Sequence, residues 1–284
     1  MYIIYALLAA LFSGLTSVFA KNGINNIDSL LATFLRTIVI SLFIFIILIF
    51  NNSLSNITVL SSKTYLFILL SGISNTLLWI CYFKALALGD VSKVTPIDKT
   101  SIILTLLLSY ILLHEPITSI KVVSMILILS GTFISINKTS TDYKESNKWI
   151  LYAVLTAIFT STTTILSKIG LDKRYTDTTT FLRTLVVMVI LTIIVISKKK
   201  YKTIKQITKK NLLFIILSGL TTSLSWLFYF KALSIGEASI VFPIEKLSLV
   251  VSIIFSKIFL KEHLSKKQLL GIIIIIIGTS LLMY

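Results

Sequence analysis

The chain has 284 residues, of which 56% are hydrophobic and only 13% are charged, and its mean hydropathy is +0.96. This composition excludes a soluble globular protein, because a fold of this size cannot bury so much apolar surface away from water. The net charge of +16 would suit a nucleic-acid-binding protein, but the basic residues stand in short loops between apolar segments, as in membrane proteins.

Ten apolar segments are long enough to cross a bilayer, for which a helix needs roughly 20 residues. In chain order, the expected helices span residues 2–20, 29–50, 64–87, 92–113, 120–136, 149–168, 178–197, 211–234, 239–260 and 267–283. The first has no basic residue before it, so we expect a membrane helix and not a cleaved signal peptide. The fold class is therefore expected to be an all-α integral membrane protein without a soluble domain.

The second half of the chain repeats the first at an offset of 229 − 82 = 147 residues. The stretch YFKALALGDVSKVTPIDK at 82–99 returns as YFKALSIGEASIVFPIEK at 229–246. Residues 1–140 and 148–284 are thus expected to form two five-helix repeats. Because five is odd, the second repeat must enter the membrane from the opposite side, which makes an inverted repeat. Such repeats enclose a central substrate cavity and support alternating access.

The two faces of the expected bundle differ in charge. Fifteen basic residues lie on one face, seven of them within Lys198–Lys210, whereas the other face carries five, namely Lys63, Lys121, Lys168, Lys173 and Arg174. The positive-inside rule then puts the lysine-rich face in the cytoplasm and both termini outside the cell. The loop at 198–210 would equally suit contact with anionic lipids on the cytoplasmic surface.

Each half carries charged residues at membrane depth, where a charge is costly and usually faces a partner or a cavity. They are Arg36 and Arg183 in the second helix of each half, and Asp98, Lys99, Glu245 and Lys246 in the fourth. Successive helical residues point about 100° apart, so we expect Asp98 to pair with Arg36 and not with its neighbour Lys99. These charges either hold the bundle together or bind the substrate or a coupling ion.

Two prolines occupy equivalent places in the fourth helix of each half. Pro96 and Pro243 are expected in the first turns, where proline is tolerated. Each would alternatively open a local break that frees a backbone carbonyl for a ligand.

Two stripes of polar and aromatic side chains follow one face of the third helix in each half. They are Gly72, Asn75, Trp79 and Tyr82, and Gly219, Thr222, Trp226 and Tyr229. Lining a cavity, the rings would bind a cationic or quaternary ammonium group, and their polar tips a zwitterion. Alternatively, the aromatic residues anchor the helices at the membrane interface and the glycines permit close packing. Trp79 and Trp226 fall well inside their segments, which favours the cavity.

No enzyme chemistry is visible in the pattern. The chain lacks a glycine-rich phosphate loop, a nucleophile elbow and paired metal-ligand spacing. The single Cys81 permits no intramolecular disulfide and no cysteine-based metal cluster. We therefore expect no catalytic residue, no metal and no cofactor.

With these features, the chain resembles the EamA-type proteins of the drug/metabolite transporter superfamily. The resemblance covers almost the whole sequence and includes an Ala-Leu-x-x-Gly turn after the third helix of each half, at 85–89 and 232–236. It also includes an early proline in the fourth helix and a glutamate at its end, Glu115 or Glu262. The resemblance implies a basket of helices around a central cavity, lined by the first four helices of each half, and secondary transport of small metabolites, often as export.

The related small multidrug resistance proteins use an essential glutamate in the first helix, which this chain lacks, so a proton-coupling carboxylate would have to be Asp98 or Glu245. We expect a monomeric secondary transporter in the cell membrane, specific for a small polar metabolite such as an amino acid or amine, coupled to H⁺ or Na⁺. An uncoupled facilitator and a quaternary-amine or drug transporter are the alternatives. The aromatic stripes favour a cation, whereas Arg36 and Arg183 would suit a carboxylate.

Overall fold

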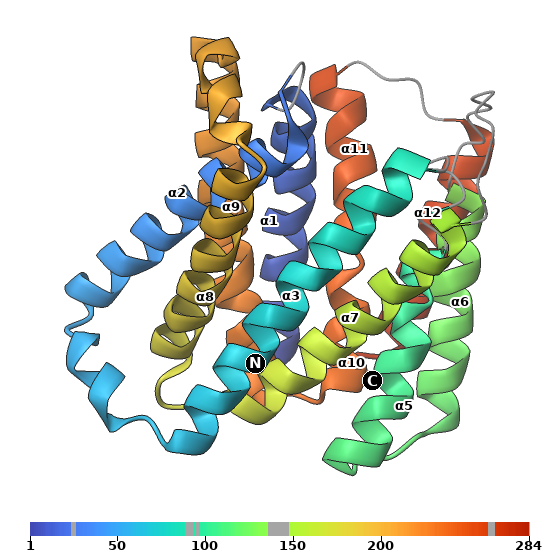
Figure 1. The fold of residues 1–284 in the computed structure, drawn as a ribbon. Helices are drawn as coiled ribbons and strands as arrows, with labels where there is room; N and C mark the ends of the chain where they lie inside the picture. The colour runs from blue at the N-terminus through green and yellow to red at the C-terminus, as the bar shows by residue number, and fades with distance from the viewer. Residues whose placement is uncertain (24–26, 89–93, 95–96, 136–147, 261–264, 284) are drawn as a thin grey trace.

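The computed structural model describes residues 1–23, 27–88, 94, 97–135, 148–260 and 265–283. Its regular structure in these ranges is helical, which confirms the predicted fold class at this level (Figure 1). The first half contains α1 (Tyr2–Gly23), α2 (Ser29–Phe50), η1 (Leu54–Val59), α3 (Ser62–Leu88), α5 (Ser101–Leu113) and α6 (Ser119–Ser135). The second half contains α7 (Lys148–Gly170), α8 (Thr176–Ser197), η2 (Lys200–Gln206), α9 (Lys209–Ile235), α10 (Ala238–Glu245), α11 (Ser248–Leu260) and α12 (Lys266–Leu281).

Seven stretches of the described chain are long and apolar enough to cross a membrane, by length and composition. They are α1 over Tyr2–Ala20, α2, α3 over Ser62–Ala85, α7, α8, α9, and the stretch Ala238–Phe255. The apolar helices α5, α6 and α12 are shorter, with 13, 17 and 16 residues. The chain is thus a multi-pass membrane protein, while the count of ten spanning helices stays a prediction.

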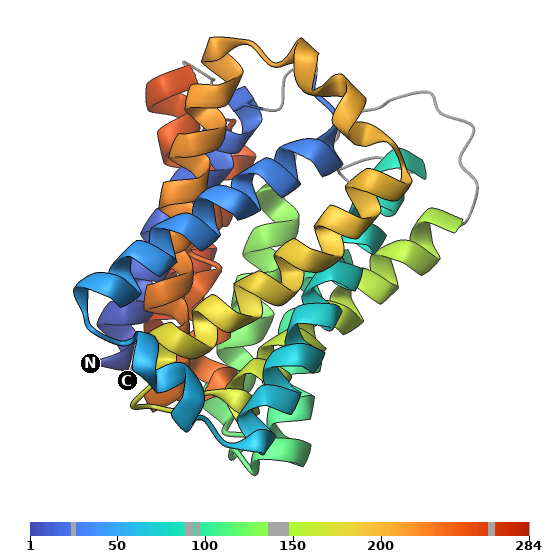
Figure 2. The same cartoon turned by 60° about the vertical axis from the view of Figure 1, so that its left-hand side comes forward.

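The helices of the two halves exchange partners. The helix α1 packs along α9, and α3 packs along α7, so the first helix of each half lies against the third helix of the other half (Figures 1 and 2). The helices α2 and α8 contact each other, as do α6 and α12. Most clusters of buried hydrophobic residues therefore combine helices of both halves.

Repeat-related glycines allow two of these contacts to be close. A Cβ atom on Gly72 would lie 2.6 Å from Cγ1 of Val186 on α8. A Cβ atom on Gly219 would lie 2.6 Å from Cγ1 of Val39 on α2. These two glycines of the predicted stripes therefore permit close helix packing, which is the second of the two interpretations of the stripes.

Both described ends of the chain lie at one end of the molecule, which we call the terminal end. Tyr2 and Met283 pack against the same cluster of buried hydrophobic residues, and Figure 1 shows the N and C labels at its lower side. The other end carries η2 and its lysines, and we call it the lysine end.

The predicted continuous helix at 239–260 is wrong, because the structure divides it into α10 and α11. Pro243 is the sixth residue of α10, and it has no N–H to donate to the preceding turn. The helix ends two residues later, and the amides of Lys246 and Leu247 donate to carbonyls three residues back. The tighter turn separates the two helices at the position of the charged residues Glu245 and Lys246.

The first half shows a similar interruption. The helix predicted over 92–113 is described as α5 only from Ser101, after a turn in which the amide of Thr100 donates to the carbonyl of Ile97. Asp98 and Lys99 are the two central residues of this turn. Pro96 lies outside the described residues.

Candidate functional site

Two adjoining cavities lie between the halves of the molecule. The small cavity has a volume of about 200 Å³ and the large cavity about 380 Å³. Both are lined by Ser13, Leu78, Trp79, Thr160, Glu245 and Lys246. The small cavity extends to Arg183 and Phe230, and the large cavity extends to Asp98 and Ser252. Because the shared lining comes from both halves, the cavities meet at their interface.

The acidic residues pair with their own neighbours. Nζ of Lys99 lies 2.9 Å from Oδ2 of Asp98, and Nζ of Lys246 lies 2.9 Å from Oε2 of Glu245. The expected pairing of Asp98 with Arg36 is therefore wrong. The expectation assumed an unbroken helix, whereas both pairs stand where a helix is interrupted, and the flexible lysine side chain folds back onto the preceding carboxylate.

Hydroxyl groups on the first helix of each half complete these pairs. Ser13 Oγ on α1 donates to Glu245 Oε1 at 2.9 Å, and Thr160 Oγ1 on α7 donates to Asp98 Oδ1 at 3.4 Å. Ser13 and Thr160 are separated by the repeat offset. Each carboxylate is thus bonded both to its own lysine and to the other half of the chain.

The two deep arginines lie over aromatic rings. The Arg36 guanidinium carbon is 5.4 Å from the ring centroid of Trp79, and that of Arg183 is 4.8 Å from Trp226 and 4.1 Å from Phe230. Neither guanidinium has a hydrogen bond or salt bridge to any described residue, and both Nε atoms are buried. The tryptophan faces that would hold a cationic ligand are therefore covered by the protein's own cations.

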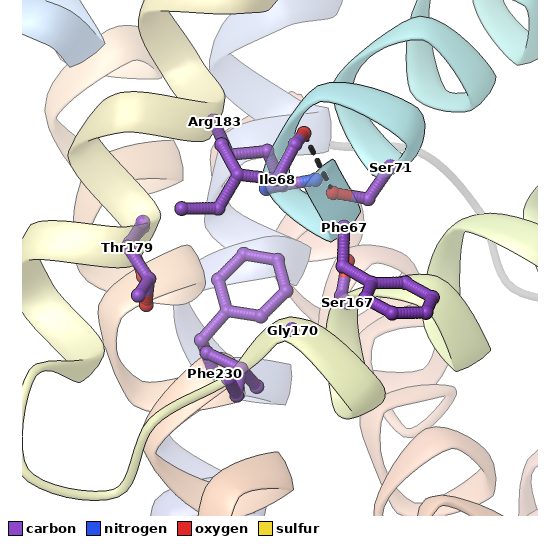
Figure 3. A pocket seen from close by; sticks show the side chains of 10 residues that line it. Phe67, Ile68, Ser71, Ser167, Gly170, Thr179, Arg183 and Phe230 are labelled. Atoms are coloured by element: carbon purple, nitrogen blue, oxygen red, sulfur yellow. Dashed lines mark hydrogen bonds between the residues drawn. The ribbon is translucent and has the colours of Figure 1, made fainter. Parts of the chain in front are cut away.

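The arginines differ in their surroundings. Arg183 lines the small cavity and is only 4% exposed, whereas Arg36 lines neither of the two central cavities. Each also borders a narrow hollow of about 10 Å³, roughly the space that one water needs. Figure 3 shows the hollow at Arg183, with Thr179 on the same side and Ser71 and Phe67 opposite.

Most of the predicted site residues meet at these cavities. Asn75, Arg183, Trp226 and Tyr229 line the small cavity, Tyr82, Asp98 and Lys99 line the large cavity, and Trp79, Glu245 and Lys246 line both. Arg36 alone stands apart. Among the described residues, no group of three or more His, Cys, Asp or Glu side chains is placed so that it could hold a metal ion.

Several lining residues escaped the sequence analysis. Phe230 and Phe242 line the small cavity, but an apolar residue that faces a cavity has the same sequence pattern as one that faces lipid. Ser167 also lines it, and here a signal existed. It follows Thr160 and Thr163 at positions i+7 and i+4 on one polar helix face.

A contact at the terminal end links the two halves. The carboxylate of Glu115, which follows α5, accepts hydrogen bonds from the amides of Ala238 and Ser239 at 2.7 and 2.9 Å and from the Ser239 hydroxyl at 2.5 Å. These donors form the N-terminus of α10, where a negative charge is favoured. The matching glutamate of the second half, Glu262, lies outside the described residues.

Two lysines add to the contacts between the halves at the terminal end. Nζ of Lys168 at the end of α7 donates to the carbonyls of Leu233 and Gly236, at 2.5 and 2.6 Å, in the Ala-Leu-x-x-Gly turn. Lys121 on α6 forms a salt bridge with Glu237, just before α10. Gly89, which ends the equivalent turn of the first half, lies outside the described residues.

Comparisons with known proteins agree with this arrangement. The model of the EamA-like transporter family matches residues 1–137 and 147–284. An uncharacterized transporter encoded in the cobO 3′ region of Sinorhizobium sp is 37% identical over 137 residues, which are 48% of this chain and 97% of the relative. That relative is therefore about as long as one repeat.

Two further matches extend over more of the chain. The uncharacterized transporter YxxF of Bacillus subtilis (strain 168) is 27% identical over 206 residues, covering 72% of this chain and 65% of that protein. A solved crystal structure with 14% identity superposes with a TM-score of 0.79, covering 99% of this chain and 96% of the other. At that identity, the similarity establishes a shared fold alone.

Proposed function

The chain belongs to the EamA-like transporter family, and from this premise we propose that it is a secondary active transporter of a small polar metabolite, of the amino acid or amine class, that works by alternating access. The observation that carries the proposal is the pair of adjoining cavities between the halves. Their walls hold both acid–lysine pairs, and charges at membrane depth mark substrate or ion pathways.

An inverted repeat of ten membrane segments supplies the mechanism in this proposal. In Figure 1, α1 rises from the terminal end whereas its counterpart α7 descends toward it, as inverted repeats require. The Ser13–Glu245 contact of one side has its counterpart in Thr160–Asp98 on the other. Exchange of conformations between the halves would expose the cavities alternately at the terminal end and at the lysine end.

The loop charges suggest the orientation of the protein in the membrane, and the buried acids suggest how transport is coupled. We propose that the protein resides in the cell membrane as a monomer, with both termini outside and the lysine end in the cytoplasm. Asp98 and Glu245 are the proposed coupling groups for H⁺ or Na⁺, because both line the cavities and each is balanced by a single lysine. Export is the proposed direction.

Reconstituted protein in liposomes tests this function. We expect counterflow of a radiolabelled amino acid or amine, and acceleration by an imposed proton or sodium gradient. Asp98→Asn and Glu245→Gln should each remove the gradient dependence, whereas Val189→Leu, on the exposed face of α8, should preserve it. Flux without counterflow or gradient dependence would instead establish an uncoupled facilitator, and absence of flux for both substrate classes would refute the proposal.

A further inference from the structure

Three residues that line the small cavity each carry a buried hydrogen-bond donor without a partner among the described residues. The donors are Nε of Arg183, Nδ2 of Asn75 and Oγ of Ser167. The three residues are 4%, 7% and 5% exposed. Buried polar groups are nearly always hydrogen-bonded, so three unsatisfied donors around one cavity require an explanation. A buried cation without a counter-charge requires one even more, because it is strongly disfavoured.

No described residue accepts a hydrogen bond from these donors. The acidic residues that line the cavities are Asp98 and Glu245, and both already accept hydrogen bonds. Glu245 accepts from Ser13 and Lys246, and Asp98 accepts from Lys99 and Thr160. The lysines neutralise the acids, which leaves the positive charge of Arg183 unbalanced at the small cavity. A water in the narrow hollow at Arg183 and Ser167 would accept hydrogen bonds but would not balance this charge, whereas an anion from outside the chain would do both.

The two tryptophan rings are unfavourable sites for a ligand cation. A quaternary ammonium ligand binds against an open aromatic face. The face of Trp226 is covered by Arg183, and that of Trp79 by Arg36. A ligand cation at either ring would lie beside a guanidinium, where like charges repel.

The donor set has no counterpart at the repeat-related positions. At the positions related by the repeat, Arg183 corresponds to Arg36, Ser167 to Ala20 and Asn75 to Thr222. Ala20 has no side-chain donor, and the Thr222 hydroxyl is already bonded to the carbonyl of Ser218 at 2.6 Å. The cluster at Arg183 is thus a departure from the internal symmetry, which packing alone does not demand.

We propose that Arg183, Asn75 and Ser167 bind a carboxylate, and that the transported metabolite is a small organic acid or amino acid that places its carboxylate in the small cavity. This rests on the proposed function and specifies its substrate class. A guanidinium with neutral N–H and O–H donors is the arrangement that recognises a carboxylate strongly. The cavity volume of about 200 Å³ suits a metabolite smaller than the drug-sized ligands that fill roughly 300–1,000 Å³.

Thermal unfolding of the purified full-length protein in detergent tests the site. The probes are sodium propionate, propylammonium chloride and choline chloride, each compared with sodium chloride at the same ionic strength. A ligand that binds the folded state raises the melting temperature by mass action. We expect propionate to raise it and the two cations to have no effect.

Variants assign the effect to the named residues. Arg183→Met should abolish the propionate shift, and should itself raise the melting temperature of the ligand-free protein, because an unbalanced buried charge is removed. The double variant Ser167→Ala, Asn75→Thr places at each position the residue found at the repeat-related position, and should weaken propionate binding at least tenfold. The matched variant Arg36→Met should retain the shift.

The possible outcomes separate this proposal from the proposed function. Propionate binding that depends on Arg183 but without flux in liposomes would support the site and overturn the transport function. Stabilisation by choline or propylammonium alone, or a propionate shift that persists in Arg183→Met, would overturn the carboxylate site even if the protein transports amines. A shift that disappears in Arg36→Met and persists in Arg183→Met would place the carboxylate site at Arg36 and would overturn the assignment to Arg183.

Discussion

The contact between Glu115 and the N-terminus of α10 should decide how firmly the terminal end stays closed. The carboxylate accepts three hydrogen bonds from Ala238 and Ser239, and Glu115 is only 7% exposed. In Glu115→Gln, one carboxylate oxygen becomes an NH₂ group that faces N–H donors. At least one charge-assisted hydrogen bond is lost, worth about 1.5–3 kcal/mol, together with about 0.3–1 kcal/mol of interaction with the helix dipole.

In the proposed alternating-access mechanism, the loss falls on one conformation, because Glu115 and α10 come from different halves and would separate on opening of this end. A destabilisation of about 2–4 kcal/mol would raise the ratio of open to closed molecules by roughly 30-fold or more, since each 1.4 kcal/mol is a factor of ten. Ser239→Ala removes one of the three bonds and leaves the two backbone amides bonded. Its effect should therefore be smaller.

Thiol labelling measures this change. In a Cys81→Ser background, Thr164→Cys places the reactive group on the wall of the small cavity. A membrane-impermeant maleimide, added from the terminal end, should react slowly with this protein and much faster after Glu115→Gln, with an intermediate rate for Ser239→Ala. If Glu115→Gln folds normally and leaves the labelling rate unchanged, the carboxylate does not hold this end closed, and the argument fails.

Two further predictions concern stability. In Gly271→Ala, the new Cβ would lie 2.5 Å from the carbonyl oxygen of Gly131, so α6 and α12 must separate. The melting temperature should fall by the equivalent of about 1–3 kcal/mol, whereas Ile273→Ala on the exposed face of α12 should change it little. Equal melting temperatures for the two variants would contradict the packing argument. Burial raises the pKa of Asp28, but its hydrogen bonds to Lys200 and to the amide of Leu31 lower the pKa more strongly, so the net direction is downward. Its charge thus stabilises the fold above the unfolded-state pKa of about 3.9 and ceases to do so as pH falls through the lower folded-state value. At pH 7 the protein should be more stable than Asp28→Asn, by less than about 1 kcal/mol for a partly exposed pair, and should therefore melt at a higher temperature. The difference in melting temperature should disappear in acid. A difference that does not depend on pH would show that the Asp28 charge is not its cause.

The sequence determines much of the architecture, because the signals involved are local or repeated. Apolar length locates the helices, and the repeat offset pairs residues such as Ser13 and Thr160 that have equivalent contacts in the structure. Periodicity also places Trp79 and Asn75 together on the face that lines the cavity. These inferences need only helix geometry and the cost of polar groups in lipid.

Tertiary contacts decide the features that the sequence could not predict. The pairing of Asp98 with Lys99 depends on an interruption of the helix, and an interruption depends on how neighbouring segments receive the freed backbone groups. The position of Arg183 between Trp226 and Phe230 depends on the contact of α8 with α9, which no local pattern specifies. The significance of Ser167 becomes visible only when its hydroxyl is found without a partner.

The packing of the helices predicts how closure and carboxylate binding are related. Asn75 on α3, Ser167 on α7 and Arg183 on α8 belong to three helices that pack together, because α3 contacts both α7 and α8. The rings that cover Arg183 come instead from α9, which packs on α1 and α2. If the two groups of helices move against each other, the donors stay together while their cover is removed. Opening the terminal end should then change the rates of binding more than the affinity.

Stopped-flow tryptophan fluorescence with sodium propionate should reveal this difference, since Trp79 and Trp226 line the small cavity. In Glu115→Gln, we expect propionate to associate and dissociate faster, with a smaller change in Kd than in either rate. Arg183→Met serves as the contrast, because it removes a donor and should abolish the signal. A Kd in Glu115→Gln that rises as far as in the double variant Ser167→Ala, Asn75→Thr would show that the donors separate on opening, and that the carboxylate site is not confined to one group of helices.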